Sequence, residues 1–129
     1  MPNPFLPKKK RKESLFSAAY GKIDTKGLEV LIASTIPFVL FDARFSSGDA
    51  TSHHIPTAQF FSREEATPAQ VKKRIPSKKT LIVVYCSNIN CPMGSHLAHH
   101  LIGMGYRNIL KYEEGIEEWI RTGHKVEKS

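Results

Sequence analysis

Short apolar runs alternate with amphipathic segments along most of the chain. Apolar runs bounded by polar or turn-forming residues predict buried strands at residues 38–41, 57–61, 81–86 and 109–112. Amphipathic spacing or a helix start signal predicts helices over residues 27–34, 63–74, 95–104 and 116–121. Apolar strands that alternate with helices predict an α/β fold, in which helices cover both faces of a mostly parallel sheet.

Residues with strong preferences for helix ends support these boundaries. Asp24 or Thr25 can cap the first helix. Ser62 is followed three positions later by Glu65, which is the pattern of a capping box. Gly105 follows the third predicted helix, and glycine readily adopts the left-handed conformation that ends many helices.

The positive charge is concentrated near the N-terminus. The 129 residues carry a net charge of +7, and residues 8–13 alone contribute +4 of it. We expect residues 1–20 to form a largely disordered basic extension and residues 21–129 to form one domain. That domain is only mildly basic, which favours a small anionic substrate over an extended nucleic-acid surface.

Within this extension, residues 7–12 (PKKKRK) closely resemble a nuclear localisation signal. Such a signal works only in a cell with a nucleus, and a solvated tail or a weak contact with nucleic acid or an anionic membrane also fits the charge. The apolar run 81–86 is far shorter than the ~20 residues that span a bilayer. With two cysteines and no secretory signal pattern, the sequence predicts a soluble cytoplasmic protein.

Cys86 follows the most apolar of the predicted strands. Ligands of parallel sheets bind beyond the carboxyl ends of the strands, where loop and helix amides without backbone partners can bind an anion. The same amides favour a thiolate, and lowering a cysteine pKa by about 2 units corresponds to about 2.7 kcal/mol. The position therefore predicts a nucleophile, although a cysteine that merely packs in the core fits the same pattern.

Five short motifs occur in the order in which one protein family carries them. They are Val39-Leu-Phe-Asp-Ala-Arg44, His54-Ile-Pro-Thr-Ala58, Val83-Val-Tyr-Cys86, Gly105-Tyr-Arg-Asn-Ile109 and Glu114-Gly-Ile-Glu-Glu-Trp119. Together they resemble the single-domain rhodaneses, which are sulfurtransferases and which carry glycine where this chain has Thr57. The resemblance covers about residues 21–126. It implies a rhodanese-like three-layer α/β fold with a mostly parallel central sheet of about five strands.

By this resemblance, Cys86 takes a sulfane sulfur from a small anionic donor such as thiosulfate and forms a persulfide. Cyanide or a thiol, including a protein thiol, then removes that sulfur, with ping-pong kinetics. The donor is expected to bind the backbone amides of the loop, namely those of Ser87, Asn88, Ile89, Asn90, Cys91 and Ser95. We expect no cofactor and no metal for this chemistry.

The loop after Cys86 departs from the family pattern. It is roughly three residues longer than the usual cradle and lacks the arginine that often precedes the helix. Position 92 is proline, whereas phosphatases of the same fold have an arginine there that binds phosphate, so phosphatase activity is disfavoured. The loop fits a rhodanese subgroup with a second cysteine, here Cys91, followed by Ser95-His-Leu-Ala98.

The role of Cys91 stays open at this point. It can resolve a persulfide on Cys86 by forming a disulfide, carry the persulfide itself, or only pack. Two further functions are therefore kept beside the sulfurtransferase. One is a non-catalytic rhodanese-fold binding or regulatory module, and the other is a thiol redox switch formed by the two cysteines.

Several other polar or aromatic residues are expected to support the fold rather than react. These are Asp42, Arg44, His54 and Trp119. His96 and His100 have the spacing of zinc ligands, but the other residues of a known zinc motif are missing. Glu113 and Glu114 could bring negative charge to the mouth of the site.

Overall fold

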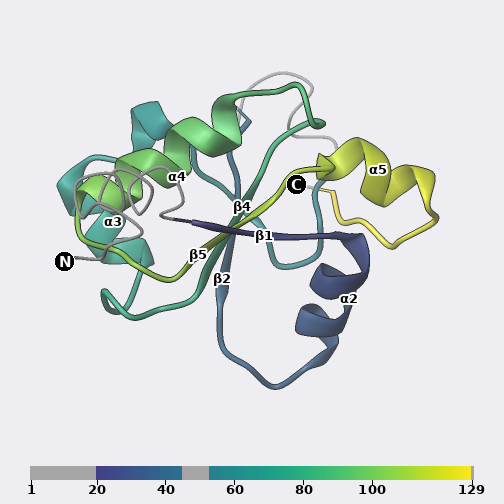
Figure 1. Cartoon of the computed structure of the whole chain (residues 1–129), viewed down its shortest axis with the longest axis horizontal. Helices are drawn as coiled ribbons and strands as arrows, with labels where there is room; N and C mark the ends of the chain where they lie inside the picture. Colours follow the sequence, from purple (N-terminus) through teal and green to yellow (C-terminus); the bar gives the residue numbers. More distant parts are fainter. Residues whose placement is uncertain (1–19, 45–52, 129) are drawn as a thin grey trace, which may run out of the picture.

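The computed structural model describes residues 20–44 and 53–128, and it contains one five-stranded sheet (Figure 1). The strand order is β1-β5-β4-β2-β3, and each neighbouring pair of strands is parallel. The strands are β1 (Gly21–Ile23), β2 (Val39–Asp42), β3 (Gln59–Phe60), β4 (Ile82–Tyr85) and β5 (Ile109–Tyr112). The predicted α/β fold with a parallel sheet is confirmed, and β4 is its central strand.

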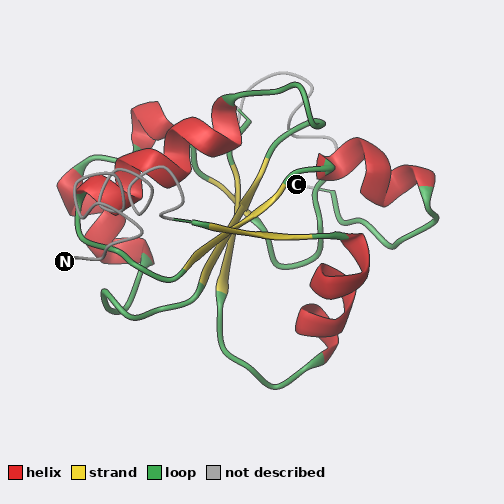
Figure 2. Ribbon diagram, viewed as in Figure 1, coloured by secondary structure: helices red, strands yellow, loops and turns green. Residues whose placement is uncertain are grey.

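Helices cover both faces of the sheet, as predicted. They are α2 (Thr25–Ala33), α3 (Pro68–Arg74), α4 (Met93–Gly103) and α5 (Gly115–Arg121). Figures 1 and 2 show α3 and α4 on one side of the strands and α2 and α5 on the other. None of the helices in the described part of the chain is long and apolar enough to cross a bilayer.

Two apolar clusters, one on each face of the sheet, explain why the central strand β4 is apolar throughout. On one face Val84 packs with Leu97 and Leu101 of α4. On the other face Tyr85 packs with Tyr112 and Trp119. Since successive side chains of a strand point to opposite faces, a central strand with both faces covered has no solvent-facing position.

Helix-end signals in the sequence are confirmed at several positions. Asp24 Oδ1 accepts a hydrogen bond from the Gly27 amide at 2.7 Å and caps α2. The Ser62 amide donates to Glu65 Oε1 at 2.8 Å, the contact expected of a capping box. Gly105, with φ of +99°, follows α4 in the left-handed conformation.

The structure differs from the predicted elements at two places. β1 was not expected, because it is a three-residue edge strand without an apolar run. The helix predicted over residues 63–74 is divided into a 3₁₀ turn, η2 (Arg63–Glu65), and α3. Pro68 causes the division because it has no amide hydrogen, and Thr67 accepts from the Gln70 amide at 3.3 Å to cap a new helix.

Residues 1–19 and 45–52 are outside the described residues, so the predicted basic extension and its localisation signal belong to that part of the chain. Tyr20 is the last residue of the predicted extension and the first described one. Its hydroxyl lies 3.2 Å from Ser95 Oγ on α4. Tyr20 therefore contacts the helix that begins after the loop of the two cysteines.

Candidate active site

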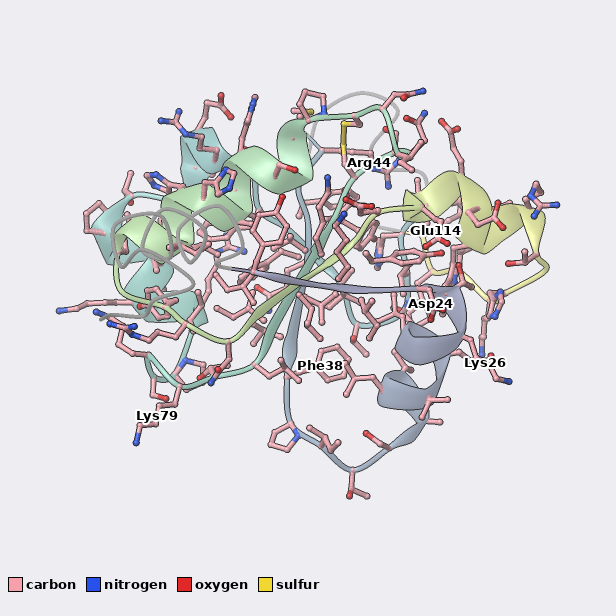
Figure 3. All side chains as sticks on the ribbon, viewed as in Figure 1. Asp24, Lys26, Phe38, Arg44, Lys79 and Glu114 are labelled. Atoms are coloured by element: carbon pink, nitrogen blue, oxygen red, sulfur yellow. A yellow bond between two sulfur atoms is a disulfide. The ribbon has the colours of Figure 1, made fainter. Side chains whose placement is uncertain are left out.

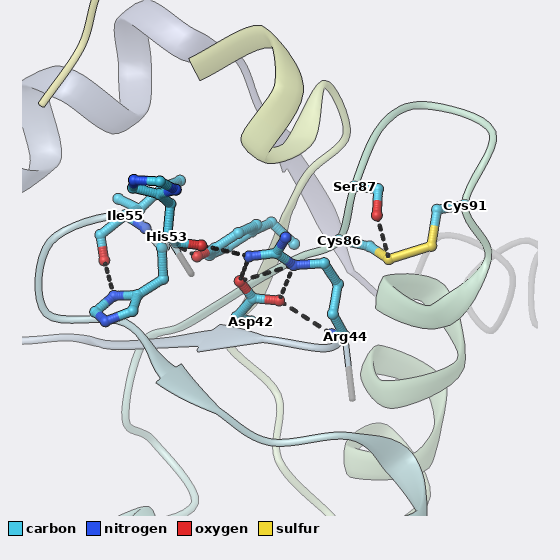
Figure 4. Close-up of polar contacts among 9 residues, drawn as sticks. Asp42, Arg44, His53, Ile55, Cys86, Ser87 and Cys91 are labelled. Atoms are coloured by element: carbon cyan, nitrogen blue, oxygen red, sulfur yellow. Dashed lines mark hydrogen bonds and ion pairs between the residues drawn. A yellow bond between two sulfur atoms is a disulfide. The ribbon is translucent and has the colours of Figure 1, made fainter. Parts of the chain in front are cut away.

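Cys86 directly follows β4, so it lies at the carboxyl end of the central strand. Its side chain is bonded to Cys91 across the loop, with 6.2 Å between the two Cα atoms (Figure 4). The residue is 2% exposed, whereas Cys91 is half-buried. The sequence predicts a nucleophile at Cys86 and leaves a disulfide with Cys91 open, and the structure describes the oxidised form of the loop.

The first residues of the loop are held by the start of α5. The carbonyl oxygens of Cys86 and Ser87 accept hydrogen bonds from the amides of Ile116 and Glu117, each at 3.0 Å. Gly115 permits this close approach, since a Cβ atom there would lie 2.6 Å from the carbonyl carbon of Ser87. Its φ of +75° also favours glycine. The Gly-Ile motif that begins α5 is therefore part of the site's framework.

Asn88 shapes the middle of the loop. Its carbonyl oxygen accepts from the Cys91 amide at 3.1 Å, and its Oδ1 accepts from the Asn90 amide at 2.9 Å. Its Nδ2 donates to Glu117 Oε1 at 3.1 Å. Two amides expected to bind an anion are thus used within the oxidised loop. The amides of Ser87 and Ile89 have no acceptor among the described residues.

The N-terminus of α4 faces this loop without a cap. Pro92 precedes the helix and offers no side-chain hydrogen bond, and the first turn contains no acidic residue. Within the described part of the chain, the amides of Met93, Gly94 and Ser95 have no acceptor. Unpaired amides and the helix dipole give this end a partial positive charge that favours an anion.

Lys111 is a residue near the site that the sequence analysis missed. It lies on β5, is 6% exposed, and its Nζ donates to Ser95 Oγ at 2.7 Å. The available signal was the lysine itself, which interrupts a predicted buried strand. A charged residue at such a position is rare unless it has a partner or a role.

Ile89 lies at the exposed outer part of the loop, with 64% of its surface accessible. Hollows adjoin it on two sides, and the residues that line them are Lys22, Ile23, Asp24, Asn88, Glu113, Glu114, Glu117, Glu118 and Arg121. Glu113 is paired with Lys22 at 3.4 Å. Acidic side chains outnumber basic ones here, so this rim disfavours small anions despite the positive net charge of the chain.

Asp42 and Arg44 form an ion pair near the loop, in which Asp42 is buried and Arg44 is partly buried (Figure 4). Arg44 Nη2 donates to Asp42 Oδ2 at 2.6 Å and to the carbonyl oxygen of His53 at 2.7 Å. Burial acts to lower the pKa of Arg44, but the hydrogen bond and charge of Asp42 outweigh it and raise that pKa. Burial, together with the charge of Asp42, raises the pKa of Tyr85, whose hydroxyl accepts from the Ile55 amide at 3.0 Å. Arg44 and Tyr85 thus hold residues 53–55 beside β2 and β4.

The remaining predicted residues lie at several places in the fold. His54 is buried, and its Nδ1 lies 3.0 Å from the carbonyl oxygen of Ile55. Trp119 packs inward and donates from Nε1 to the carbonyl oxygen of Lys125 at 2.8 Å. His100 Nε2 lies 2.8 Å from the carbonyl oxygen of Ala66. No group of three potential metal ligands occurs among the described residues.

One backbone conformation links the fold to a family motif. Thr57 has a φ of +73° and is the one non-glycine residue among those described that has a positive φ. It occupies the position at which the rhodanese motif has glycine. A β-branched residue is strained in this region of φ, which explains why the motif has glycine at this position.

The sequence model of the rhodanese-like domain matches residues 25–122, about three quarters of the chain. The chain belongs to the rhodanese-like domain family. No curated protein matches it by sequence. Because the matched residues contain both cysteines and every helix in the described part of the chain, the family covers the whole candidate site.

Solved structures share this rhodanese-like fold. The BH2092 protein from Bacillus halodurans is 23% identical with a TM-score of 0.73, and the match covers 95% of this chain and 86% of that one. The human single-domain sulfurtransferase TSTD1 is 22% identical with a TM-score of 0.64, covering 78% and 95%. A thiosulfate sulfurtransferase from Pseudomonas aeruginosa is 17% identical with a TM-score of 0.69, covering 88% of this chain and 21% of that one. At these identities the likeness establishes the fold.

Proposed function

We propose that the reduced protein is a rhodanese-type sulfurtransferase and that Cys86 carries its persulfide. The observation that carries the proposal is the position of Cys86, between the carboxyl end of the central strand and the uncapped start of α4. Membership of the rhodanese-like family and the fold shared with sulfurtransferases support it. Unpaired amides at this end of α4 are suited to an anionic donor.

The proposed reaction has two sulfur-transfer steps. The Cys86 thiolate attacks the outer sulfur of thiosulfate, the sulfur–sulfur bond of thiosulfate breaks, and sulfite leaves with the bonding electron pair. Cys86 then holds a persulfide anion, so the total charge is unchanged. An acceptor thiolate or cyanide attacks the outer sulfur next, and the Cys86 thiolate leaves.

The oxidised loop must be reduced before this cycle can begin. In the disulfide Cys86 has no thiolate and is 2% exposed. An external thiolate reaches the half-buried Cys91 more easily, and its attack there releases Cys86 as a thiolate. A second thiol of the reductant then frees Cys91, so two electrons in total are supplied by a dithiol.

Intact mass measurement tests the proposal directly. Protein reduced and freed of reductant should gain ~32 Da with thiosulfate, and unreduced protein should gain nothing. Cys86→Ser should abolish the gain and Cys91→Ser should keep it. The opposite pattern would assign the persulfide to Cys91. No gain in any form would favour a non-catalytic binding module.

A redox switch is the second candidate function, because the structure contains the Cys86–Cys91 disulfide. The Cys91 thiolate can attack the inner sulfur of the protonated Cys86 persulfide, which forms the disulfide and releases the outer sulfur with its proton as hydrosulfide. A peroxide can also oxidise the two thiols to the disulfide while it is reduced to water or an alcohol. Loss of two thiols in monomeric protein after mild peroxide, without any sulfur transfer, would favour the switch.

A further inference from the structure

Lys111 is a buried cation without a carboxylate partner in the described part of the chain. The other buried charged residue described, Asp42, is paired with Arg44. The ion pairs of the described residues do not include Lys111. Its ammonium group has three hydrogens to donate, and the hydrogen bond found for it among these residues goes to Ser95 Oγ.

The sheet register places Lys111 on the same face as Cys86. Lys111 of β5 is the register partner of Val84 in β4, and Val84 packs beneath α4. Partner residues of neighbouring strands point to the same face, as do residues two apart along one strand. Cys86 directly follows β4 and is two residues after Val84, so continuing the alternation of the strand by one residue places Cys86 on the α4 face together with Lys111.

The first turn of α4 lies directly over this lysine. A Cβ atom added to Gly94 would lie 3.4 Å from Lys111 Cε and 3.6 Å from the carbonyl carbon of Tyr85, the residue before Cys86. The lysine side chain and the backbone that leads into Cys86 therefore both lie beside Gly94. Its ammonium group ends at Ser95, in the same turn whose amides are unpaired.

A buried ammonium without a counter-charge is unfavourable, because its hydration is lost and the hydrogen bond to Ser95 replaces only part of it. The disulfide is neutral and does not offset this cost. A thiolate or a persulfide anion at Cys86 would offset it, and the lysine would in turn favour ionisation of the sulfur. The two groups are expected to stabilise each other only after the loop is reduced.

We propose that Lys111 is a positioning residue that favours the anionic forms of the Cys86 sulfur. It acts together with the unpaired amides of α4, and its charge is present in both steps of the proposed transfer. Its effect on the thiolate follows from the geometry alone, whereas its effect on the persulfide rests on the proposed function.

Some of the other charged groups near Lys111 favour an anion at Cys86, and others disfavour it. On β1, Lys22 is its register partner and is exposed, and it pairs with Glu113 of the β5 end. Glu114 and Glu117 of the loop's rim oppose an anion at Cys86, but they are at least partly exposed and are screened by water. On the α4 side the titratable groups are His96, His99 and Tyr20, and on the β2 side Arg44 is already paired with Asp42.

The pH dependence of Cys86 alkylation tests the role of Lys111. Each variant is made in a Cys91→Ser background, reduced, treated with iodoacetamide from pH 5 to 10, and followed by intact mass. Lys111→Met should raise the apparent pKa of Cys86 by about one unit or more, which lowers the rate near pH 6 roughly tenfold. Lys111→Arg keeps the charge, so the apparent pKa of Cys86 in this variant should stay close to its value with Lys111.

Two further variants separate charge from hydrogen bonding and from nonspecific effects. Lys111→Gln keeps a hydrogen-bond donor for Ser95 but removes the charge, so it should raise the apparent pKa of Cys86 as Lys111→Met does. If Lys111→Met does not fold, Lys111→Gln is used in its place. Lys79→Met removes an exposed lysine far from the disulfide (Figure 3) and should leave the profile unchanged. Unchanged profiles in folded Lys111→Met or Lys111→Gln would overturn the proposal.

The outcome is distinguishable from failure of the proposed function, because iodoacetamide is neutral and needs no sulfur donor. A shifted profile without any mass gain from thiosulfate would uphold the charge effect and reject the sulfurtransferase. A mass gain with an unshifted profile would uphold the sulfurtransferase and reject the role of Lys111.

Discussion

Gly115→Ala is expected to disturb the candidate site from outside the loop. The added Cβ atom would lie 2.6 Å from both the carbonyl carbon and oxygen of Ser87, and 2.7 Å from the carbonyl oxygen of Cys86. All three contacts are with backbone atoms, which cannot rotate away as a side chain can. The loop and the start of α5 must therefore move apart.

The cost has three parts that can be estimated separately. A φ of +75° is unfavourable for alanine by roughly 1–2 kcal/mol. Overpacking against a rigid neighbour costs typically about 1–3 kcal/mol. The two hydrogen bonds from Ile116 and Glu117 contribute about 0.5–1.5 kcal/mol each, and movement of the loop weakens both. With both hydrogen bonds lost we expect a loss of about 3–8 kcal/mol, a large share of the stability of a typical domain.

Two other glycines provide matched controls. Gly123 has a φ of +81° but nothing within 4 Å of an added Cβ atom, so Gly123→Ala should cost only the conformational strain. Gly103 lies in α4 with open space around it, and Gly103→Ala should stabilise the protein by roughly 0.5–1 kcal/mol. Urea unfolding of the reduced proteins gives the three free energies.

Reactivity gives an independent measure of the same displacement. Gly115→Ala should slow alkylation of reduced Cys86 or shift its pH profile, whereas Gly123→Ala should leave both unchanged. The reasoning would be refuted if Gly115→Ala were no more destabilising than Gly123→Ala. That result would mean that contact with Cys86 and Ser87 does not constrain the residue.

Three other substitutions test separate parts of the structure. Thr57→Gly should stabilise the protein by roughly 1–2 kcal/mol in urea unfolding, because it removes the strain of a φ of +73°; a destabilised variant would contradict this. Asp42→Asn should cost roughly 1–3 kcal/mol in the same assay, since it removes a charged hydrogen-bond partner from the partly buried Arg44 cation, and an unchanged free energy of unfolding would show that solvent replaces the pair. Tyr85 has a raised pKa in the folded protein, so its contribution to stability is complete below pH 10 and is lost as the pH rises above it. The unfolding free energy of Tyr85→Phe should therefore fall less steeply above pH 10, by about 1.4 kcal/mol per pH unit, and parallel curves would argue against the shift.

The layers of the fold could be predicted from the sequence because burial leaves a strong pattern. A central strand covered on both faces must be apolar at every position, and β4 and β5 are nearly so. Helix ends at Asp24 and Gly105 were also predictable, because capping depends on local residue chemistry. The edge strand β1 leaves no such pattern, since two of its three residues are exposed.

The candidate site was predictable in its position but not in its state. The end of an apolar strand located Cys86, and the five motifs gave its family. The disulfide depends on the path of the loop. The side chain of Asn88 helps to set that path through hydrogen bonds to Asn90 and Glu117, which the sequence does not reveal. The proximity of Lys111 to the loop depends on the pairing of two strands about 25 residues apart, which periodicity along one segment does not contain.

The two ends of the reactive loop are anchored unequally. The Cys86 end is bound to α5 through two carbonyl oxygens, whereas the Cys91 end is joined by the sulfur–sulfur bond and one amide contact to Asn88. Breaking the disulfide leaves the first end bound to α5, and it leaves the second end with the amide contact to Asn88 and the peptide bond to Pro92 at the start of α4. Reduction should therefore free Cys91 and its neighbours more than Cys86, so that a molecule approaches the thiol from the side of α4, where the unpaired amides lie.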